Sequence, residues 1–391
     1  MMENSKALQI ISDSAVQAAL VADQGEGATL DTWEDAPFIK EGDTFATFVT
    51  SIHVKFKKDK QPKQISYVLK INPCQEGKEW LHILFEKEGK FYMEFLPELN
   101  KIMSESGQNL LPFPKCYYAQ YEKGKEMLIF EDLRLNEFKM IDRRIGMDLQ
   151  HASLVIKGLG HFHAASSILL KKNSIDDLKS RYPFLFCDIY LQFGMDQMSA
   201  PLLTTVKEIL STVGGHEKAI NWLDKQQQNL REFFETNLAS CPPFNVICHG
   251  DCLNNNVLFR YDEAGSPVEA MLLDLQINRI ASLATDLNHF LFGSIDGSVR
   301  KPNIDQLLND YYTSFSSVIE EYGEPLPFTK EDLVQEYRKK NAYGLIVANN
   351  VIPAVTQENV PDLESLDLGN PACKPRLVAM YDEMLEEGLF N

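Results

Sequence analysis

The sequence predicts an α+β fold with two lobes, a small β-rich lobe at the N-terminus and a larger, mainly helical lobe after it. Strand-like segments dominate up to about residue 130, with one prominent helix among them, and helical periodicity dominates beyond Asp132. The length of 391 residues suits two lobes with a cleft between them, and 44% hydrophobic residues can supply a large core. We therefore expect residues 1–132 to form the N-terminal lobe and residues 133–391 the C-terminal lobe.

The N-terminal lobe is predicted to hold two β-hairpins and one long helix. Its strand-like segments, rich in β-branched and aromatic residues, are residues 45–56, 64–71, 117–121 and 126–131. The charged run 57–62 is expected to turn the first hairpin, and Lys123-Gly124 the second. Between the hairpins, Leu81 to Leu96 carries apolar residues at helical spacing. The first 35 or so residues are expected to form a helix over residues 5–22 and then a polar connector.

The C-terminal lobe is predicted to be built from helices around one pair of strands. Segments with helical periodicity cover residues 153–170, 198–213, 220–238, 304–322 and 330–347. An apolar strand pair over residues 245–275 interrupts them, with the turn 262–267 between its two strands. This interruption is where the most informative motif of the chain lies.

Composition excludes some classes of partner. The formal net charge of −18 disfavours binding to nucleic acid or to an anionic membrane, because both require basic surface. No apolar run approaches the roughly 20 residues that span a bilayer, and the N-terminus is too polar and acidic for a targeting peptide. The seven cysteines form no C-x-x-C pair, and Cys248 and Cys252 are poorly spaced for zinc. Free thiols suit a reducing compartment, so we expect a cytoplasmic protein.

The motif sets Asp251, Asn256 and Asp274 at the ends of two apolar strands. The stretch His249-Gly-Asp-Cys-Leu-Asn-Asn-Asn256 separates an aspartate from an asparagine by the spacing of H-R-D-x-x-x-x-N, with Gly250 in place of the arginine. Phosphoryl transfer from ATP needs a carboxylate to orient and deprotonate the acceptor hydroxyl, and oxygen ligands to hold magnesium. We therefore predict Asp251 as the general base and Asn256 and Asp274 as Mg²⁺ ligands. His249 is expected to hold the loop rather than to transfer a proton.

The N-terminal lobe offers candidate groups for the nucleotide phosphates. Lys70 lies on a predicted strand and is expected to reach the α- and β-phosphates, paired with one of three glutamates of the following helix, Glu86, Glu88 or Glu94. The segment Gly42-Asp-Thr-Phe-Ala-Thr47 precedes a strand where a phosphate-covering loop belongs, although it has only one glycine. Its backbone amides and the Thr44 hydroxyl are candidates for phosphate contacts.

Taken with these motifs, the chain resembles the ecdysteroid kinase-like family, a branch of the choline kinase and aminoglycoside phosphotransferase group. The resemblance extends from about Gly42 over nearly the whole chain, and the His249-Gly-Asp251 loop and Leu273-Asp-Leu-Gln276 are its most specific blocks. It implies a bilobal protein-kinase-like fold with ATP in the cleft, covered by the N-terminal lobe, and the acceptor site on the C-terminal lobe. It also selects Glu88 as the partner of Lys70.

The resemblance implies further site residues. Glu131 to Leu133 would form the hinge whose backbone meets adenine, and Asp286 would brace the catalytic loop. The implied activity is ATP- and Mg²⁺-dependent phosphorylation of a small-molecule alcohol, with an ecdysteroid as the leading acceptor. Choline, an amino alcohol or a hydroxylated xenobiotic stays open as the acceptor, as does a catalytically silent nucleotide-binding module. The aromatic stretch Tyr182, Phe184, Phe186, Tyr190 and Phe193 either lines the acceptor site or belongs to the core. The oligomeric state is left open.

Overall fold

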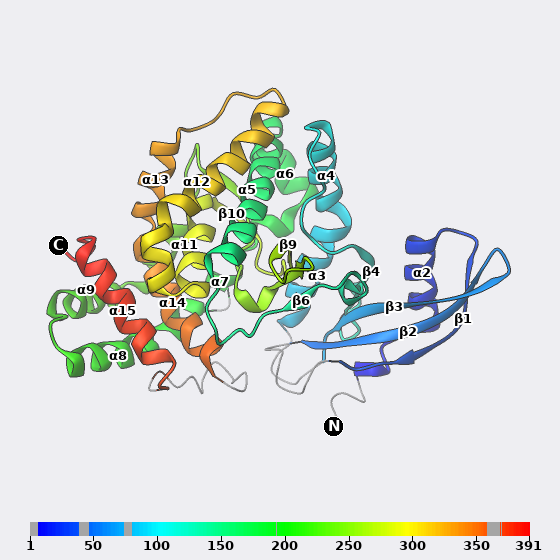
Figure 1. The fold of residues 1–391 in the computed structure, drawn as a ribbon, viewed down its shortest axis with the longest axis horizontal. Helices are drawn as coiled ribbons and strands as arrows, with labels where there is room; N and C mark the ends of the chain where they lie inside the picture. Colours follow the sequence, from blue (N-terminus) through cyan, green and yellow to red (C-terminus); the bar gives the residue numbers. More distant parts are fainter. Residues whose placement is uncertain (1–6, 39–46, 74–79, 193, 358–367, 369) are drawn as a thin grey trace. The chain divides into compact units, whose positions relative to one another are not determined.

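The computed structural model describes residues 7–38, 47–73, 80–192, 194–357, 368 and 370–391 (Figure 1). The chain divides into two compact units, unit 1 comprising Met1–Glu98 and Phe113–Lys139, and unit 2 comprising Leu99–Pro112 and Met140–Asn391. Unit 1 contains an antiparallel β-sheet and unit 2 is mainly helical, which confirms the predicted α+β fold class. The expected lobe boundary between residues 132 and 133, with the role assigned to each lobe, stays a prediction.

Unit 1 is built on a five-stranded antiparallel sheet with the strand order β1-β2-β3-β5-β4. Its strands are β1 (Ala28–Asp35), β2 (Phe48–Lys58), β3 (Gln61–Ile71), β4 (Cys116–Gln120) and β5 (Met127–Glu131). The β2–β3 hairpin turns on Asp59 and Lys60, both with positive φ, because Lys58 pairs directly with Gln61. The predicted turn was therefore too long, since Lys57 pairs with Pro62 inside the ladder.

The polar connector expected after the first helix is wrong, because residues 28–35 form the edge strand β1. This strand pairs only with β2, and its side chains are mostly half-buried or exposed. An edge strand needs little apolar surface of its own when a neighbouring strand supplies the backbone hydrogen bonds. The polar composition of the segment therefore hid its strand character.

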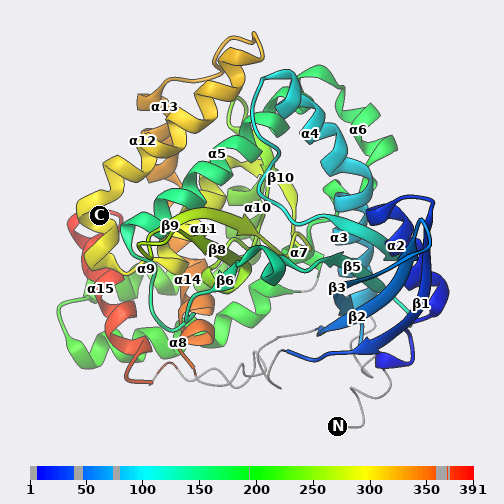
Figure 2. The same ribbon diagram turned by 45° about the vertical axis from the view of Figure 1, so that its right-hand side comes forward.

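Helix α2 (Asp13–Gln24) covers one face of this sheet (Figures 1 and 2). Its buried residues Ala15, Val16 and Ala19 belong to the same core cluster as the sheet residues Ile52, Val54, Tyr67, Leu69, Ile71, Met127 and Ile129. Because side chains alternate along a strand, Tyr67, Leu69 and Ile71 of β3 point to this face. Ser66 and Lys70 consequently point to the opposite face.

The helix predicted over residues 81–96 is present but extends further. It runs as α3 (Leu81–Lys90), a π-helical turn (Phe91–Phe95) and α4 (Leu96–Glu105). The five apolar residues that defined its predicted face are all buried: Leu81, Leu84, Phe85, Phe91 and Phe95. Single π-helical turns inside α-helices occur often at functional sites, and this one directly follows the turn that carries Glu88.

Unit 2 packs its helices around short strands. The strands are β7 (Asn245–Cys248), β8 (Val257–Tyr261), β9 (Pro267–Leu272) and β10 (Arg279–Ser282), and β6 (Lys139–Met140) spans the division between the units. β8 and β9 form the predicted hairpin, and β7 pairs with β10. The motif of residues 249–256 thus follows β7, and Asp274 comes two residues after the end of β9.

The predicted helices of unit 2 are present, with two differences. The helices are α5 (Leu149–Lys172), α6 (Ile175–Arg181), α7 (Ile189–Gln192), α8 (Met195–Val213), α9 (Glu217–Gln228), α10 (Leu230–Leu238), α11 (Leu283–Ser294), α12 (Gly297–Glu321), α13 (Lys330–Lys339), α14 (Asn341–Thr356) and α15 (Cys373–Glu386). The single helices expected over 220–238 and 330–347 are each broken in two, because Asn229 and Lys340 leave helical dihedral angles. None of the helices among the described residues is both long and apolar enough to cross a bilayer.

Helices α5 and α12 run side by side through unit 2 (Figures 1 and 2). Their close approach depends on Gly160 of α5, where an added Cβ would lie 2.8 Å from the backbone oxygen of Tyr311 and 3.2 Å from the backbone nitrogen of Phe315. The opposing atoms belong to the backbone of α12, so they move only if the helix moves. α5 also carries His163, so this packing positions a residue of the candidate site.

We predict that Gly160→Ala destabilises the protein by about 1–3 kcal/mol, because the extra methyl group overpacks the α5–α12 contact. The measurement is the thermal unfolding midpoint, which should fall. Gly158→Ala is the matched control on the same helix. Its added Cβ would meet a side chain instead, Pro112 Cγ at 3.1 Å, so the change should be smaller. Equal effects of the two substitutions would contradict the proposed role of Gly160.

Candidate active site

In unit 1, Lys70 and Glu88 form a buried ion pair. Lys70 Nζ lies 2.6 Å from Glu88 Oε2, and the two residues are 8% and 2% exposed. Lys70 comes from β3, on the sheet face opposite to α2, and Glu88 comes from α3. A buried charge is costly without a partner, so each side chain compensates the burial of the other. Glu86, the alternative partner, instead pairs with Lys90 at 2.5 Å on the same helix.

The predicted hinge residues lie at the end of β5. Glu131 is the last residue of β5, and Leu133 begins a short 3-10 helix (Leu133–Asn136). Asp132 between them is buried, caps this helix by accepting from the Arg134 backbone, and accepts a hydrogen bond from the Ser66 hydroxyl at 2.6 Å. The segment after β5 is therefore tied to β3 by a side chain that sequence reasoning missed. Thr44 lies outside the described residues.

In unit 2, the catalytic motif forms a loop between β7 and β8 that is internally hydrogen-bonded. Asn256 Nδ2 donates to the backbone oxygen of Asp251 at 2.9 Å and to Asp251 Oδ2 at 3.1 Å. The backbone oxygen of Asn256 accepts from the Leu273 N–H at 2.9 Å, which joins the loop to the segment carrying Asp274. Asp274 itself has a φ of 67°, a left-handed conformation that aspartate tolerates better than most residues. One local network thus positions Asp251, Asn256 and Asp274.

Gly250 is required by the shape of this loop. Its φ is +85°, and an added Cβ would lie 2.3 Å from the backbone oxygen of Ile277. Both the conformation and the space therefore exclude a side chain at this position.

Asp286 of α11 holds the backbone of the loop. Its carboxylate accepts from the N–H groups of His249 and Gly250, at 2.5 Å and 2.9 Å, and from His163 Nε2 at 3.1 Å. Burial alone would raise the pKa of the Asp286 carboxyl, but the hydrogen bond and charge of His163, with the Gly250 N–H, lower it to about 2. Asp286 is therefore an anion, 1% exposed, that fixes the two residues before Asp251.

Two buried histidines complete this support. His163 of α5 binds Asp286 through Nε2 and the Tyr311 hydroxyl through Nδ1 at 2.9 Å. The Asp251 N–H donates to His249 Nδ1 at 3.3 Å, in keeping with the loop-holding role expected for His249. Burial lowers the pKa of His249, so its ring is neutral near pH 7. The sequence did not predict this role of His163, because a histidine on an apolar helix face gives no signal for a specific partner.

The oxygen atoms near Asp251 fit a magnesium ion. Asn256 offers an amide oxygen and Asp274 a carboxylate, which are the hard oxygen ligands that Mg²⁺ prefers. The buried Gln276 Oε1 has no hydrogen-bond partner among the described residues. No group of three or more His, Cys, Asp or Glu side chains suited to a metal occurs in the described ranges. An Mg²⁺ site with one carboxylate and one amide would not form such a group, because ATP and water supply its other ligands.

The remaining candidates of the sequence are the aromatic stretch and two cysteines. Tyr182, Phe184 and Tyr190 of the aromatic stretch are buried, and Phe193 lies outside the described residues. Burial raises the pKa of the Cys248 and Cys252 thiols, so both are protonated near neutral pH.

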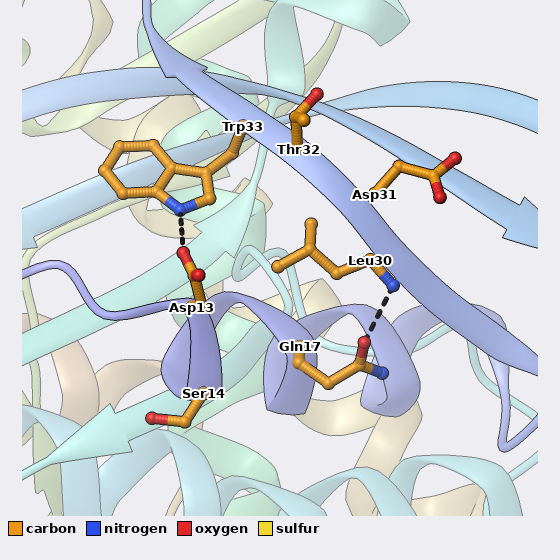
Figure 3. Close-up of a pocket in the computed structure, with 7 residues that line it drawn as sticks. All are labelled: Asp13, Ser14, Gln17, Leu30, Asp31, Thr32 and Trp33. Carbon is orange, nitrogen blue, oxygen red and sulfur yellow. Dashed lines mark hydrogen bonds between the residues drawn. The ribbon is translucent and has the colours of Figure 1, made fainter.

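A hollow of about 630 Å³ between α2 and β1 is lined by none of the predicted site residues (Figure 3). It is lined by Asp13, Ser14, Gln17, Leu30, Asp31, Thr32 and Trp33. Across it, the Trp33 indole N–H donates to Asp13 Oδ1 at 2.8 Å and the Leu30 N–H donates to Gln17 Oε1 at 2.7 Å. These hydrogen bonds join the helix to the edge strand, so the polar lining has a structural explanation.

Comparison with known proteins identifies the class. The family model described as the ecdysteroid kinase-like family matches residues 41–324. The chain therefore belongs to this family, and it is a small-molecule kinase by class.

A solved structure entitled "Structure of the GDP and kanamycin complex of APH(2")-IIia" is similar over 94% of this chain and 97% of its own, at 11% identity and a TM-score of 0.41. A TM-score of this size is too low to support a conclusion. No curated protein matches the chain.

The pH dependence of stability should report on Asp286. Its pKa is lowered from 3.8 to about 2, so its contribution is complete above pH 3.8 and is lost as the pH falls towards 2. We expect Asp286→Asn to lower the free energy of unfolding near pH 7. Between about pH 4 and 2, the variant should lose about 2 kcal/mol less stability than the wild type. Unfolding midpoints across this pH range provide the test. Asp305→Asn, at an exposed position, is the control, and parallel acid curves for wild type and Asp286→Asn would contradict the role of Asp286.

Proposed function

We propose that the protein is an ATP- and Mg²⁺-dependent phosphotransferase that phosphorylates a hydroxyl of a small molecule, with an ecdysteroid as the leading acceptor. The observation that carries this proposal is the hydrogen-bonded loop in which Asn256 contacts Asp251 and joins the segment of Asp274. Family membership supports the reaction class. The ecdysteroid is supported by the family description and by no contact in the structure.

In this proposal, Asp251 aligns the acceptor hydroxyl and takes its proton as the oxygen attacks the γ-phosphorus of ATP. Asn256 and Asp274 would hold magnesium, which neutralises charge on the phosphate oxygens when it is bound. The contact from Asn256 fixes the Asp251 side chain before the acceptor arrives, so the geometry does not need to be organised during the reaction. Asp286 and His249 act indirectly, by holding the loop.

Lys70 would contact the α- and β-phosphates, with Glu88 holding its ammonium group between nucleotides. Glu131 to Leu133 would supply backbone contacts to adenine, and the Thr44 segment would cover the phosphates. The net charge of −18 favours a small-molecule acceptor over nucleic acid or an anionic membrane surface. Free thiols among the described residues, such as Cys241, Cys248 and Cys252, favour a cytoplasmic location.

Replacement of Asp251 tests the chemistry. We expect Asp251→Asn to keep Mg²⁺-ATP binding near normal and to lower turnover by about a thousandfold or more, because the amide cannot accept the proton. Turnover is measured as ADP formation with ecdysteroids, choline, ethanolamine and a panel of steroid and phenolic alcohols. Turnover on another alcohol, lost in the variant, would keep the mechanism and replace the acceptor. Undiminished turnover in the variant would remove Asp251 from its role, and nucleotide binding without transfer to any alcohol would favour a silent binding module.

Replacement of Lys70 tests the nucleotide site. We expect Lys70→Met to weaken Mg²⁺-ATP binding by roughly 10–100-fold, the value of one charged hydrogen bond to phosphate. The double variant Lys70→Met with Glu88→Gln should bind Mg²⁺-ATP as weakly as the single variant Lys70→Met. It should be more stable than that single variant, because no unpaired charge stays buried. Lys90→Met removes a lysine of the half-buried Lys90–Glu86 pair and should bind normally. Calorimetric titration measures the affinity of each variant for Mg²⁺-ATP. Unchanged affinity in Lys70→Met would exclude the role of Lys70 in phosphate binding.

A further inference from the structure

His289 is a buried histidine without an assigned role, on the same helix as Asp286. It lies three residues after Asp286 on α11, so the two side chains leave the helix on neighbouring positions of one face. His289 is 2% exposed, and neither of its ring nitrogens has a hydrogen-bond partner among the described residues. Buried polar groups are normally paired, so an unpaired imidazole calls for an explanation outside packing.

The His289 ring lies near the proposed general base. His289 Nε2 lies 3.7 Å from Asp251 Oδ1, while Asp251 Oδ2 accepts the hydrogen bond of Asn256. A distance of 3.7 Å is too long for a hydrogen bond. Contacts of catalytic groups are, however, often long in the absence of substrate and shorten in the reacting complex. A shift of less than about 1 Å would make this contact a hydrogen bond.

The surroundings keep the His289 ring uncharged. Burial lowers the pKa of His289 to about 3, the negative charge of Asp286 acts to raise it, and Arg279 and His249 lower it further. Arg279, 3% exposed, places its guanidinium 4.6 Å from the Tyr190 ring and donates to the Tyr343 hydroxyl at 3.2 Å. A neutral imidazole has one N–H donor and one acceptor nitrogen, and it can therefore donate to a carboxylate without forming a salt bridge.

We propose that His289 is a positioning residue for the general base, donating its Nε2–H to Asp251 Oδ1. The Asp251 carboxylate is then held from two sides, by Asn256 on Oδ2 and by His289 on Oδ1. The proton leaves the hydroxyl for Asp251, and His289 keeps its own proton throughout. This inference rests on the proposed function, because it acts through Asp251.

The kinetic test compares two substitutions at one position. His289→Gln keeps an N–H donor near the position of Nε2, whereas His289→Leu removes it and keeps a buried side chain. The assay uses Mg²⁺-ATP with ecdysone as the acceptor, or with water as the acceptor if ecdysone is not turned over. We expect His289→Leu to lower kcat by about tenfold or more. The KM for ATP should change by less than about threefold, and His289→Gln should recover most of kcat. Normal kcat in His289→Leu would overturn the proposal.

Two further measurements separate positioning from a structural role. His289→Leu removes two unpaired buried nitrogens, so its unfolding midpoint should stay equal or rise. A lower midpoint and equal loss of kcat in both His289 variants would overturn the proposal. In the Asp251→Asn background, His289→Leu should lower turnover no further, because the residues act as a unit. An additional loss there would also count against it. Wild-type turnover in Asp251→Asn would instead overturn the proposed function itself.

Nitrogen NMR tests the contact without any acceptor. The chain has eight histidines, and with ¹⁵N-labelled histidine the His289 signals are identified by their loss in His289→Gln. We expect a neutral ring protonated on Nε2, and a change of the Nε2 shift in Asp251→Asn. A ring protonated on Nδ1, or an Nε2 shift insensitive to Asp251→Asn, would overturn the proposal even in a fully active enzyme.

Discussion

The candidate site depends on one buried carboxylate, that of Asp286. It accepts two consecutive backbone N–H groups of the catalytic loop and a histidine from α5, so it joins α5, α11 and the loop after β7 at one point. A buried anion is stable only when its lone pairs are satisfied, and here each contact that stabilises the charge also fixes part of the site. The hydrogen bonds that Asp286 accepts therefore fix the position of Asp251.

The two units compensate their buried charges in different ways. In unit 1, Lys70 and Glu88 neutralise each other over 2.6 Å. In unit 2, Asp286 is neutralised mainly by hydrogen bonds from the backbone and from a histidine. The first arrangement holds one side chain of β3 against one of α3, whereas the second holds a peptide loop in place.

The sequence was sufficient where a local signal coincided with the structure. The β2–β3 and β4–β5 hairpins combine β-forming residues with a turn, and Asp251, Gly250 and Asn256 stand in one short motif. The sequence did not predict edge strand β1, because the segment is polar in composition and its backbone hydrogen bonds come from β2. The helix breaks at Asn229 and Lys340 depend on dihedral angles that periodicity does not encode. The contacts of His163 and His289 were not predicted for another reason. His163 meets Asp286 across 123 residues of sequence, and a histidine on an apolar helix carries no sign of such a partner.

The confinement of Gly250 bears on how such an enzyme can be controlled. In protein kinases an arginine occupies this position, and activation loops are ordered by phosphorylation through arginine–phosphate pairs. Here the Ile277 carbonyl fills the space that any side chain would need, so no cation can be placed at this point of the loop. A phosphorylated segment therefore has nothing to bind at this position.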